Sequence, residues 1–547
     1  MNLASSVFER NSRQHTAVLR PARMAAADRA AIAAGTPGRE LMERAGGACT
    51  RVAVRQAGGI GGARFLVLAG PGNNGGDGFV VARRLREQRG AVRCLFVGDP
   101  HEIRGDAALH ADLMRRSGVP LSVVDGQSAL PPADVVVDAL FGTGFRGALT
   151  GAAAALVDRL SLLPESVRVV SVDMPSGVNG RTGEVLGPVV RANCTVAVQA
   201  LKPGLLLGEG AERAGEIHCV DIGIPLPERP DAWCADLSTA VSAVPLRGVS
   251  AHKWQAAVLV IGGSTGMTGA PQLAARAAFR AGAGLVTLAT ARVVSEIVQM
   301  GTPEVMTVAL PDDGSGIGPG ADQFLRERIP FARYGALALG MGLGRAGHLR
   351  AFVQSVLAAS PNPVVLDADG LNALRPDDLV AARAPLVLTP HVGELARLGC
   401  EIGDAADRLE KVQAAAQAWG SVLLAKGPVT IVAAPGAVPV FCTSGTSDLG
   451  TAGSGDVLSG VIAAYIARGA SLQDAAVAGA CVHGRAGWRA ATRGESRTRE
   501  HSVGVGIRPG FSPLSRAVFR PVARWIVAGD VIEELGSAEM QLRECTG

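Results

Sequence analysis

Short apolar runs, glycine-rich turns and helical stretches rich in alanine and arginine alternate along most of this chain. Apolar runs of this length, bounded by turns, predict strands that are buried on both faces of a parallel sheet. In the first half, the predicted strands are 64–69, 92–97, 134–140, 167–173 and 195–199. In the second half, they are 257–261, 284–289, 336–339, 364–367, 385–388, 421–425 and 430–433. The pattern therefore predicts an α/β protein.

A proline-rich stretch divides the two sets of strands. Residues 222–250 contain Pro225, Pro227, Pro230 and Pro245 without a clear period, which is typical of a linker. A chain of 547 residues is also too long for one ordinary core. We therefore expect four parts: a disordered lead-in over 1–18, a first domain over 19–228, a linker over 229–248 and a second domain over 249–540.

The segment 493–524 breaks the pattern of strands and helices and contains seven arginines. We interpret it as a solvated insertion in the second domain, and a surface for an anion or a partner is the alternative. Residues 525–535, which follow it, have helical spacing and are expected to pack on the domain.

The composition narrows the classes of protein. The net charge is +4 and aromatic residues make up 4% of the chain, which does not favour binding to nucleic acid. No apolar run reaches the roughly 18 residues of a membrane span, and residues 1–14 lack the apolar core of a secretion signal. Nine cysteines occur without a CxxC pair, which favours reduced thiols. We expect a cytoplasmic homo-oligomer without nucleic-acid or membrane partners.

The most informative motif of the first half is GPGNNGGDG at 70–78, between a predicted strand and a helix expected to start near Phe79. Its glycines let the backbone approach a ligand closely, and the N–H groups at the start of a helix suit an anion. Asn73, Asn74 and Asp77 add polar groups that a purely structural turn does not need. The structural alternative is a tight turn with Asp77 as the N-cap. The dinucleotide pattern GxGxxG does not fit cleanly.

Two more predicted strands end in acidic residues that are followed by flexible loops. Asp138 precedes the loop 142–147, in which Arg146 is available for phosphate, and Asp173 precedes the loop 174–177. Ligands of an open parallel sheet bind beyond the carboxyl ends of its strands, so all three loops are expected to converge on one site. Taken alone, Asp138 is equally consistent with a cap.

The segments 70–83, 138–147 and 171–183, with the helical segment 41–46 before them, resemble the YjeF N-terminal family of NAD(P)HX epimerases. The resemblance implies a Rossmann-like three-layer α/β/α domain that acts on hydrated nicotinamide dinucleotides. It places these residues on the hydrated dinucleotide: Asn73, Asn74, Gly75, Gly76, Asp77, Gly142, Thr143, Gly144, Phe145, Arg146, Gly147, Ala148 and Asp173.

The same resemblance implies a potassium ion beside Asn74, Asp138 and Ser176. Amide, carboxylate and hydroxyl oxygens are the ligands that a hard cation prefers. We expect Asp173 to transfer a proton at the hydrated ring carbon, because a carboxylate in a closed pocket can act as acid or base.

In the second half, the loop TAGSGD at 451–456 precedes an apolar helix predicted over 457–467. Its glycines free the backbone to curl around an anion, and the helix supplies aligned N–H groups and a positive dipole end. Asp456, at the start of this helix, is expected to take a proton from a substrate hydroxyl, and a plain N-cap is the alternative. The Walker pattern GxxxxGK[ST] is absent, so a phosphate is expected to bind here in another way.

Three further strand ends carry charged side chains. Lys426 follows a predicted strand among apolar residues, where a lysine is costly unless it meets an anion such as phosphate. His391 and Glu394 lie in the motif TPHVGE, and Asp367 and Asp369 lie in LDADG. These carboxylates can position Mg²⁺ through water, although Asp367 as a plain cap is an equal alternative. Spacing suitable for tetrahedral zinc is missing.

Six segments of the second half resemble the ADP-dependent NAD(P)HX dehydratases, which have a ribokinase-like fold. They are 262–271, 340–345, 366–374, 388–398, 424–432 and 450–460. The resemblance places Ala270, Gly342, His391 and Asp456 on the hydrated dinucleotide. It places Lys426, Gly427, Pro428, Val429, Thr430 and Gly455 on the adenine nucleotide, ADP or AMP.

The chain departs from this second family at three places. HKWQAA at 252–257 replaces HKGxxG, so that Trp254 and Gln255 stand in a segment that loses both glycines. Ala452 replaces a glycine before the phosphate loop, and 445–450 lacks the usual asparagine. These departures bear on nucleotide affinity rather than on the fold.

The two resemblances together imply a bifunctional enzyme that repairs the hydrates NADHX and NADPHX. The first domain would interconvert the (R) and (S) epimers, and the second would dehydrate the (S) epimer to NAD(P)H with release of AMP and phosphate. Phosphorylation by ADP with Mg²⁺ makes the ring hydroxyl a better leaving group. The loop 450–456 and Lys426 would hold the phosphates, and Asp456 would deprotonate the attacking hydroxyl.

Two other functions are compatible with parts of the sequence. A ribokinase-like small-molecule kinase would use the same loop and aspartate, but it leaves the first domain without a purpose. A non-catalytic binding module is the second alternative, because relatives of the first domain serve in this way in RNA turnover. The joint presence of Asn74, Asp138 and Asp173 speaks against it.

Overall fold

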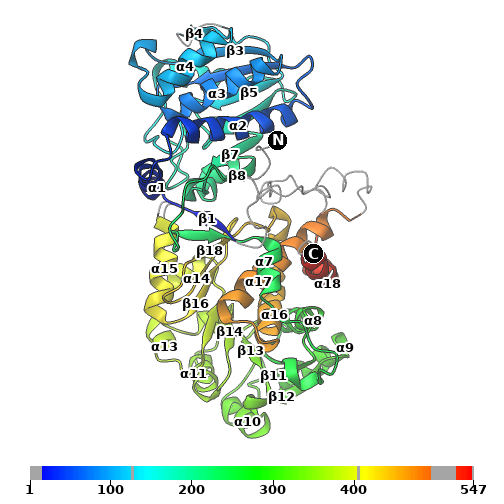
Figure 1. Ribbon diagram of the computed structural model, residues 1–547. Coiled ribbons are helices and arrows are strands. Elements are labelled where there is room, and N and C mark those ends of the chain that lie inside the picture. Colours follow the sequence, from blue (N-terminus) through cyan, green and yellow to red (C-terminus); the bar gives the residue numbers. More distant parts are fainter. Residues whose placement is uncertain (1–14, 125–128, 403–406, 494–524, 545–547) are drawn as a thin grey trace.

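The computed structural model describes residues 15–124, 129–402, 407–493 and 525–544, which form two domains with one sheet each (Figure 1). The sheet of the first domain is entirely parallel, in the order β4-β3-β2-β5-β6-β7-β8. Its strands are β2 (Arg64–Ala69), β3 (Ala91–Phe96), β4 (Leu121–Val123), β5 (Val135–Ala139), β6 (Arg168–Val172), β7 (Cys194–Val198) and β8 (Glu216–Val220).

Helices cover both faces of this sheet and give the three layers that were expected. On one face, Val52, Phe79 and Met114 of three helices are buried against the strands, and on the other face Leu156 is buried. The helices of this domain are α1 (Pro21–Ala33), α2 (Gly38–Gln56), α3 (Asn73–Glu87), α4 (Gly105–Arg116), α5 (Gly151–Leu160) and α6 (Gly208–Arg213). Of these, α2, α3 and α4 lie on the first face and α5 lies on the second.

The second domain is built on a larger, mixed sheet in the order β1-β9-β18-β17-β16-β15-β14-β13-β10-β11-β12. The strands from β16 to β12 in this order are parallel, whereas β17 pairs antiparallel with both β16 and β18. The strands are β1 (Thr16–Val18), β9 (Ala232–Cys234), β10 (Ala257–Ile261), β11 (Leu285–Ala291), β12 (Met306–Leu310), β13 (Ala336–Leu339), β14 (Val364–Leu366), β15 (Leu386–Leu388), β16 (Val422–Ala425), β17 (Thr430–Ala433) and β18 (Val440–Cys442).

Two groups of helices enclose this sheet. Those on one face are α7 (Leu237–Ser242), α8 (Gly269–Arg280), α16 (Ser454–Ala467), α17 (Leu472–Ala491) and α18 (Ala528–Glu544). Those packed in the other apolar cluster are α10 (Ala321–Arg328), α11 (Leu349–Ala359), α12 (Asp369–Asn372), α13 (Pro376–Val380), α14 (Val392–Arg397) and α15 (Arg408–Trp419), and α9 (Arg292–Gly301) contributes to both. No helix among the described residues is long and apolar enough to cross a membrane.

Strand order fixes where each domain offers a cleft. In the first sheet, the chain moves outward in one direction from β2 and in the other from β5, and these two strands are neighbours. In the second sheet, β10 and β13 are neighbours in the same way. The loops after such strands diverge, which opens a crevice at their carboxyl ends. The glycine-rich loops after these four strands are those singled out in the sequence.

The glycine-rich motif of the first domain is helical where a loop was expected. Helix α3 begins at Asn73, not near Phe79, and its N-cap is Gly72 rather than Asp77. The glycines are required by close packing, because a Cβ at Gly75 would lie 1.8 Å from the carbonyl oxygen of Gly70. They therefore allow the first turn of α3 to press against the end of β2.

Two expected irregular segments contain ordered elements. In the predicted lead-in, Thr16–Val18 forms β1, and in the predicted linker, residues 229–248 contain β9 and α7. β1 pairs with β9, and β9 pairs with β18, so both belong to the second sheet (Figure 1). The chain therefore enters the second domain before it forms the first. Residues 1–14 and all but the first residue of the predicted insertion 493–524 lie outside the described residues.

The C-terminal helix packs on the second domain, as expected, although it spans α18 rather than 525–535. Glu539 of this helix is buried and forms an ion pair with Arg468 (2.9 Å). It also accepts a hydrogen bond from the hydroxyl of Tyr465 (3.0 Å). These contacts fix α18 against the end of α16.

Candidate functional site

The first candidate site lies where β2, β5 and β6 end. Asp138 is fully buried and accepts hydrogen bonds from Ser176 Oγ (2.6 Å), Ser176 N (2.9 Å) and Ser171 Oγ (2.8 Å). Burial raises the pKa of Asp138, and the hydrogen bonds from Ser176 and Ser171 oppose that shift. Among the described residues, no basic side chain forms an ion pair with it. Asp138 is therefore a buried carboxylate with neutral partners, not a cap.

Asp173 follows β6 with a positive φ of 65°. Such a backbone costs a non-glycine residue about 1–3 kcal/mol and is concentrated at functional sites. Its Oδ1 forms an ion pair with Lys202 Nζ, and its Oδ2 accepts a hydrogen bond from Thr143 N (3.3 Å). Lys202 is 1% exposed and also donates to the carbonyl oxygen of Val198 (2.9 Å). The pair is a buried carboxylate and ammonium at the end of the sheet.

The predicted convergence of the three loops is confirmed by their distances. A Cβ added at Gly142 would lie 3.0 Å from Asn74 Oδ1 and 3.3 Å from Asp173 Oδ2. The side chains of Asn74 and Asp173 therefore meet at the loop that follows β5. Nδ2 of Asn74 is buried and has no hydrogen-bond partner in the part of the chain that the structure describes.

Asp77 adds a second carboxyl group to this site. Burial raises its pKa well above the ordinary value, and the nearby charges of Asp173 and Asp28 add to the shift, whereas Lys202 opposes it. A carboxyl group held in its neutral form can donate a hydrogen bond or a proton. Asp77 and Asp173 are thus close to one another, and only Asp173 has the lysine as a direct partner.

The remaining predicted residues of the first domain divide by exposure. Asn73 is exposed at the start of α3, and Gly75 and Gly76 are buried within it. The exposed members of the loop after β5 are Gly144, Arg146, Gly147 and Ala148. The ring of Phe145 is half-buried against Phe141, with 5.4 Å between the ring centroids.

Lys202 is the residue of this site that sequence reasoning missed. It lies in Leu201-Lys-Pro-Gly, shortly after the predicted strand 195–199. A lysine among apolar residues at a strand end is the signal that identified Lys426 in the second domain. The same criterion would have found Lys202.

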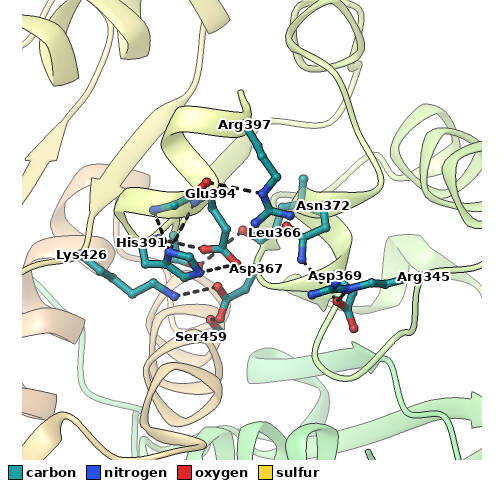
Figure 2. A network of polar contacts seen from close by, with 12 residues as sticks. Arg345, Leu366, Asp367, Asp369, Asn372, His391, Glu394, Arg397, Lys426 and Ser459 are labelled. Carbon is teal, nitrogen blue, oxygen red and sulfur yellow. Dashed lines mark hydrogen bonds and ion pairs between the residues drawn. The ribbon is translucent and has the colours of Figure 1, made fainter. Parts of the chain in front are cut away.

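The second candidate site gathers at the carboxyl ends of β14, β15 and β16 (Figure 2). Asp367 has a side chain 2% exposed, and it accepts hydrogen bonds from Lys426 Nζ (2.9 Å) and Ser459 Oγ (2.7 Å). The anion that Lys426 meets in this structure is therefore a carboxylate, where phosphate was expected. Burial lowers the pKa of Lys426, but Asp367 and Glu394 outweigh burial and raise it. Asp367 is an ion-pair partner rather than a cap.

Asp456 lies in the first turn of α16, as expected, and the N-cap is Gly453 with φ of 85°. Burial raises the pKa of Asp456 to about 7, and Asp367 adds to the shift, whereas Lys426 opposes it. A carboxylate with a pKa near neutrality has the balance of charge state and basicity that a general base needs. A Cβ at Gly455 would lie 3.3 Å from Lys426 Nζ, so the start of α16 is next to the lysine.

His391 is the N-cap of α14 and combines with Glu394 in a capping box. Its Nδ1 accepts a hydrogen bond from Gly393 N (2.9 Å), and its backbone N–H donates to Glu394 Oε2 (2.8 Å). Because the side chain of His391 is 59% exposed, Nε2 can meet a ligand while Nδ1 holds the ring. Nε2 also lies 3.5 Å from Glu394 Oε1, so a ligand at this nitrogen would share it with that carboxylate.

A strained backbone also occurs in the second site. Ala368, between Asp367 and Asp369, has a positive φ of 48°. Asp369 Oδ2 accepts a hydrogen bond from Gly344 N (2.9 Å). This bond joins the loop after β13 to the loop after β14, so that the two predicted glycine- and aspartate-containing loops form one wall.

The other predicted residues of the second site occupy two places. Gly342 has a positive φ of 64°, and a Cβ there would lie 3.3 Å from Cβ of Ala270. In the turn between β16 and β17, Gly427 and Pro428 are exposed, while Val429 is 4% exposed and belongs to the core. Thr430 is half-buried at the start of β17. Val429 can therefore face a ligand only with its backbone, because its side chain is buried.

The departures at 252–257 lie away from this site. His252 caps a short 3₁₀ helix, Lys253–Ala256, that leads into β10, and Gln255 completes its capping box. The ring of Trp254 packs edge-on against Tyr334 with 5.6 Å between centroids. These residues precede β10 and β13, whereas the site follows the strands, so they support the opposite edge of the sheet.

Ala452 is exposed in the turn before α16. The non-glycine residues with positive φ among those described are Arg89, Asp173, Gln199 and Ala368. Alanine at 452 therefore adopts an ordinary backbone conformation, and the glycine that the turn requires, Gly453, is present.

No group of three or more His, Cys, Asp or Glu side chains arranged to hold a metal ion occurs within the described ranges. The predicted potassium ligands of the first site, Asn74, Asp138 and Ser176, are not such a group, because two of them would offer an amide oxygen and a hydroxyl oxygen. The buried carboxyl group of Asp138, which has no cationic partner among the described residues, fits a cation, and at Asn74 the ligand would be the amide oxygen Oδ1.

Comparisons with known proteins identify the two domains. A family model described as YjeF-related protein N-terminus matches residues 38–204, and one described as NAD(P)H-hydrate dehydratase matches 258–504. The chain is 41% identical over 454 residues to a bifunctional NAD(P)H-hydrate repair enzyme of Moorella thermoacetica, covering 78% of this chain and 83% of that protein. It is 37% identical over 500 residues to one of Salinibacter ruber, covering 86% and 92%.

Among solved structures, an ADP/ATP-dependent NAD(P)H-hydrate dehydratase from Bacillus subtilis is similar with a TM-score of 0.44 and 23% identity, covering 57% of this chain and 99% of that one. The expected fold classes, Rossmann-like for the first domain and ribokinase-like for the second, are confirmed. By its identity to these relatives and the share of their length that it covers, the chain belongs to the family of bifunctional NAD(P)H-hydrate repair enzymes.

Proposed function

We propose that this chain converts both epimers of NADHX and NADPHX to NADH and NADPH. The first domain interconverts the (R) and (S) hydrates, and the second dehydrates the (S) hydrate with ADP. The observation that carries the second step is Asp456, a carboxyl group with a pKa of about 7 at the start of α16, next to Lys426. The first step is carried by the buried pair of Asp173 and Lys202.

In the dehydration, the ring hydroxyl attacks the terminal phosphorus of ADP while Asp456 takes the hydroxyl proton. The bond from that phosphorus to AMP breaks, and AMP leaves. The carbon–oxygen bond to the new phosphate then breaks, phosphate departs with the bonding electrons, and the neighbouring ring carbon loses a proton. The N–H groups at the start of α16 and the ammonium of Lys426 stabilise charge on the transferred group.

For Lys426 to reach a phosphate, it must share its positive charge between that phosphate and Asp367. Its Nζ is already 2.9 Å from Asp367, and the side chain is 23% exposed. An ammonium group has three donors, so one can stay on the carboxylate while others meet the nucleotide. Asp367 would thus position the lysine. We place Lys426, Gly427, Pro428, Val429, Thr430 and Gly455 on the nucleotide, and Ala270, Gly342, His391 and Asp456 on the hydrate.

In the epimerisation, we assign proton transfer at the hydrated carbon to Asp173. Lys202 forms an ion pair with this carboxylate, and burial raises the pKa of the nearby Asp77. The loop 142–148, which is partly exposed, would cover the hydrate, which would lie against α3 at Asn73 and Asn74. Water is excluded from a site of this kind when the loop closes over the substrate.

Two metal ions belong to this proposal. Potassium would be held by Asn74, Asp138 and Ser176, where it supplies positive charge beside the substrate. Mg²⁺ would enter with ADP and neutralise the phosphates as the nucleotide binds. The cytoplasmic location and the homo-oligomer expected from the sequence stay predictions.

Potassium chloride is expected to stabilise the first domain more than the same concentration of tetramethylammonium chloride. The bound ion would complete the partners of Asp138, and at about tenfold above its Kd it would contribute about 1.4 kcal/mol. The measurement is the midpoint of unfolding of the first domain within the full chain, in each salt. The difference is expected to vanish in Asp138→Asn, and equal midpoints for the wild type in both salts would remove the potassium site.

The function is tested by the return of reduced-nicotinamide absorbance from hydrated cofactor. With ADP and Mg²⁺, purified (S) hydrate should be converted completely, and purified (R) hydrate should follow through epimerisation. ATP in place of ADP gives the nucleotide preference, and NADHX against NADPHX gives the cofactor preference. Recovery with neither nucleotide would end the dehydratase proposal, and a phosphorylated product without recovery would identify a small-molecule kinase.

A further inference from the structure

Arg408 is the first residue of α15 and lies directly against the turn between β16 and β17. Its Nη2 donates a hydrogen bond to the carbonyl oxygen of Lys426 (3.2 Å). A Cβ at Gly427 would lie 2.2 Å from Nη2 and 2.8 Å from Nη1, so the guanidinium fits only because residue 427 has no side chain. A sequence reading that stops at the turn itself does not find this arginine, which precedes it by 18 residues.

No carboxylate among the described residues balances the positive charge of Arg408. Within the described residues, no carboxylate forms an ion pair with its guanidinium, and its Nε is buried without a hydrogen-bond partner. Burial lowers the pKa of Arg408, and no acidic neighbour offsets that shift. Arg408 is half-buried, and a cation that is partly removed from water is stabilised by a compensating anion.

The neighbouring Lys426 differs in this respect. Its ammonium is paired with Asp367 at 2.9 Å. Of the two cations at this turn, the lysine therefore has a carboxylate partner, and the arginine has none in the part of the chain that the structure describes. An anion that binds at the turn would complete the partners of Arg408.

We propose that Arg408 is a positioning and charge-bearing residue for the nucleotide, whose guanidinium holds the turn at Lys426–Gly427 open to a di- or triphosphate and supplies the positive charge that the phosphates require. This inference rests on the proposed nucleotide site and adds to it a residue outside the turn. Arginine suits the task because its planar group can lie flat on a glycine while its donors point to both a carbonyl oxygen and an anion.

The test compares nucleotides with and without phosphates. Binding of ADP and of adenosine to the full chain is measured by calorimetry for the wild type, Arg408→Met and Arg408→Lys. Arg408→Met is expected to weaken ADP by at least tenfold and adenosine by less than twofold, and Arg408→Lys should recover part of the ADP affinity. The matched control is Arg328→Met, which removes an exposed arginine from α10.

Steady-state kinetics give a second readout. Arg408→Met should raise KM for ADP by at least tenfold, while KM for the (S) hydrate stays within twofold. Equal weakening of ADP and adenosine would reduce Arg408 to a structural support, and unchanged ADP affinity would also overturn the proposal. A wild type that binds neither ADP nor ATP would instead refute the nucleotide site itself, so the two failures are distinguishable.

Discussion

Replacing Asp456 with asparagine is expected to abolish dehydration and to leave epimerisation intact. Asparagine keeps the shape of the side chain at the start of α16 but cannot take a proton from the attacking hydroxyl. General-base catalysis contributes about 10²- to 10⁴-fold, so kcat for recovery of the (S) hydrate should fall by that factor. Conversion of (R) to (S) hydrate, followed by chromatography without nucleotide, is the internal control because it depends on the other domain.

The pH dependence follows from the pKa of about 7 for Asp456. The base acts only when ionised, so kcat/KM for the hydrate should decrease as pH falls below about 7. The stability effect has the opposite sign, because the raised pKa means that the folded protein favours the protonated form. The contribution of Asp456 to the free energy of unfolding is therefore fully present below about pH 4 and is lost as pH rises through about 7.

Asparagine at position 456 does not ionise, so Asp456→Asn does not lose stability as pH rises. The second domain of the variant should therefore be more stable than that of the wild type at pH 8, and the difference should disappear toward pH 4. Unfolding midpoints across this range measure it, and Asp377→Asn, an exposed change on α13, is the control. A variant that retained dehydratase activity within a factor of two would rule out Asp456 as the base.

Many strands of both sheets could be predicted because they are short apolar runs with turns on each side, although β4, β8, β12 and β18 were not predicted. β2, β10, β13 and β17 begin and end where the pattern placed them. β1 and β9 could not be predicted in this way. Each has three residues, and each exists because its partner offers backbone hydrogen bonds from a distant part of the chain.

The site residues show the same division between local and distant information. Asp138, Asp173 and Asp456 were found because each stands at the end of a predicted strand or the start of a predicted helix. Lys202 was missed although its place at a strand end among apolar residues is a local signal, whereas Arg408 was missed because its role arises from a contact with a residue 18 positions away. A motif shows which residue types one segment contains, whereas the charge balance of a buried group depends on the segments packed against it.

The glycines of GPGNNGGDG illustrate a wrong physical reason behind a useful motif. They were interpreted as allowing the backbone to approach a ligand closely, but Gly75 and Gly76 are buried in the first turns of α3. Their small size brings the helix start close to the end of β2, which places Asn74 at the site. Close approach to a ligand and close packing of a helix both require glycine, so the motif alone does not distinguish the two.

Asp173 and Lys202 are expected to be coupled in stability but not interchangeable in catalysis. Asp173→Asn removes the carboxylate and should lower (R)-to-(S) conversion by at least 10²-fold. Lys202→Met leaves a buried carboxylate without its cation. We expect this change to lower the free energy of unfolding of the first domain by about 3–5 kcal/mol. Asp173→Asn with Lys202→Met leaves no unpaired charge, so its cost should be smaller than the sum of the single costs.

The double variant separates the two roles because stability and activity respond differently. If the ion pair served only the fold, restoring charge balance in the double variant would restore epimerisation along with stability. We expect stability to recover and epimerisation to stay absent, because the proton-transferring carboxylate is missing. Denaturant unfolding of the first domain measures the former, and conversion of (R) hydrate without nucleotide measures the latter. Conversion of the (S) hydrate to NAD(P)H with ADP should stay at the wild-type rate in all three variants, since Asp456 and Lys426 are unchanged. Full epimerisation by Asp173→Asn would refute the assignment of proton transfer to this residue.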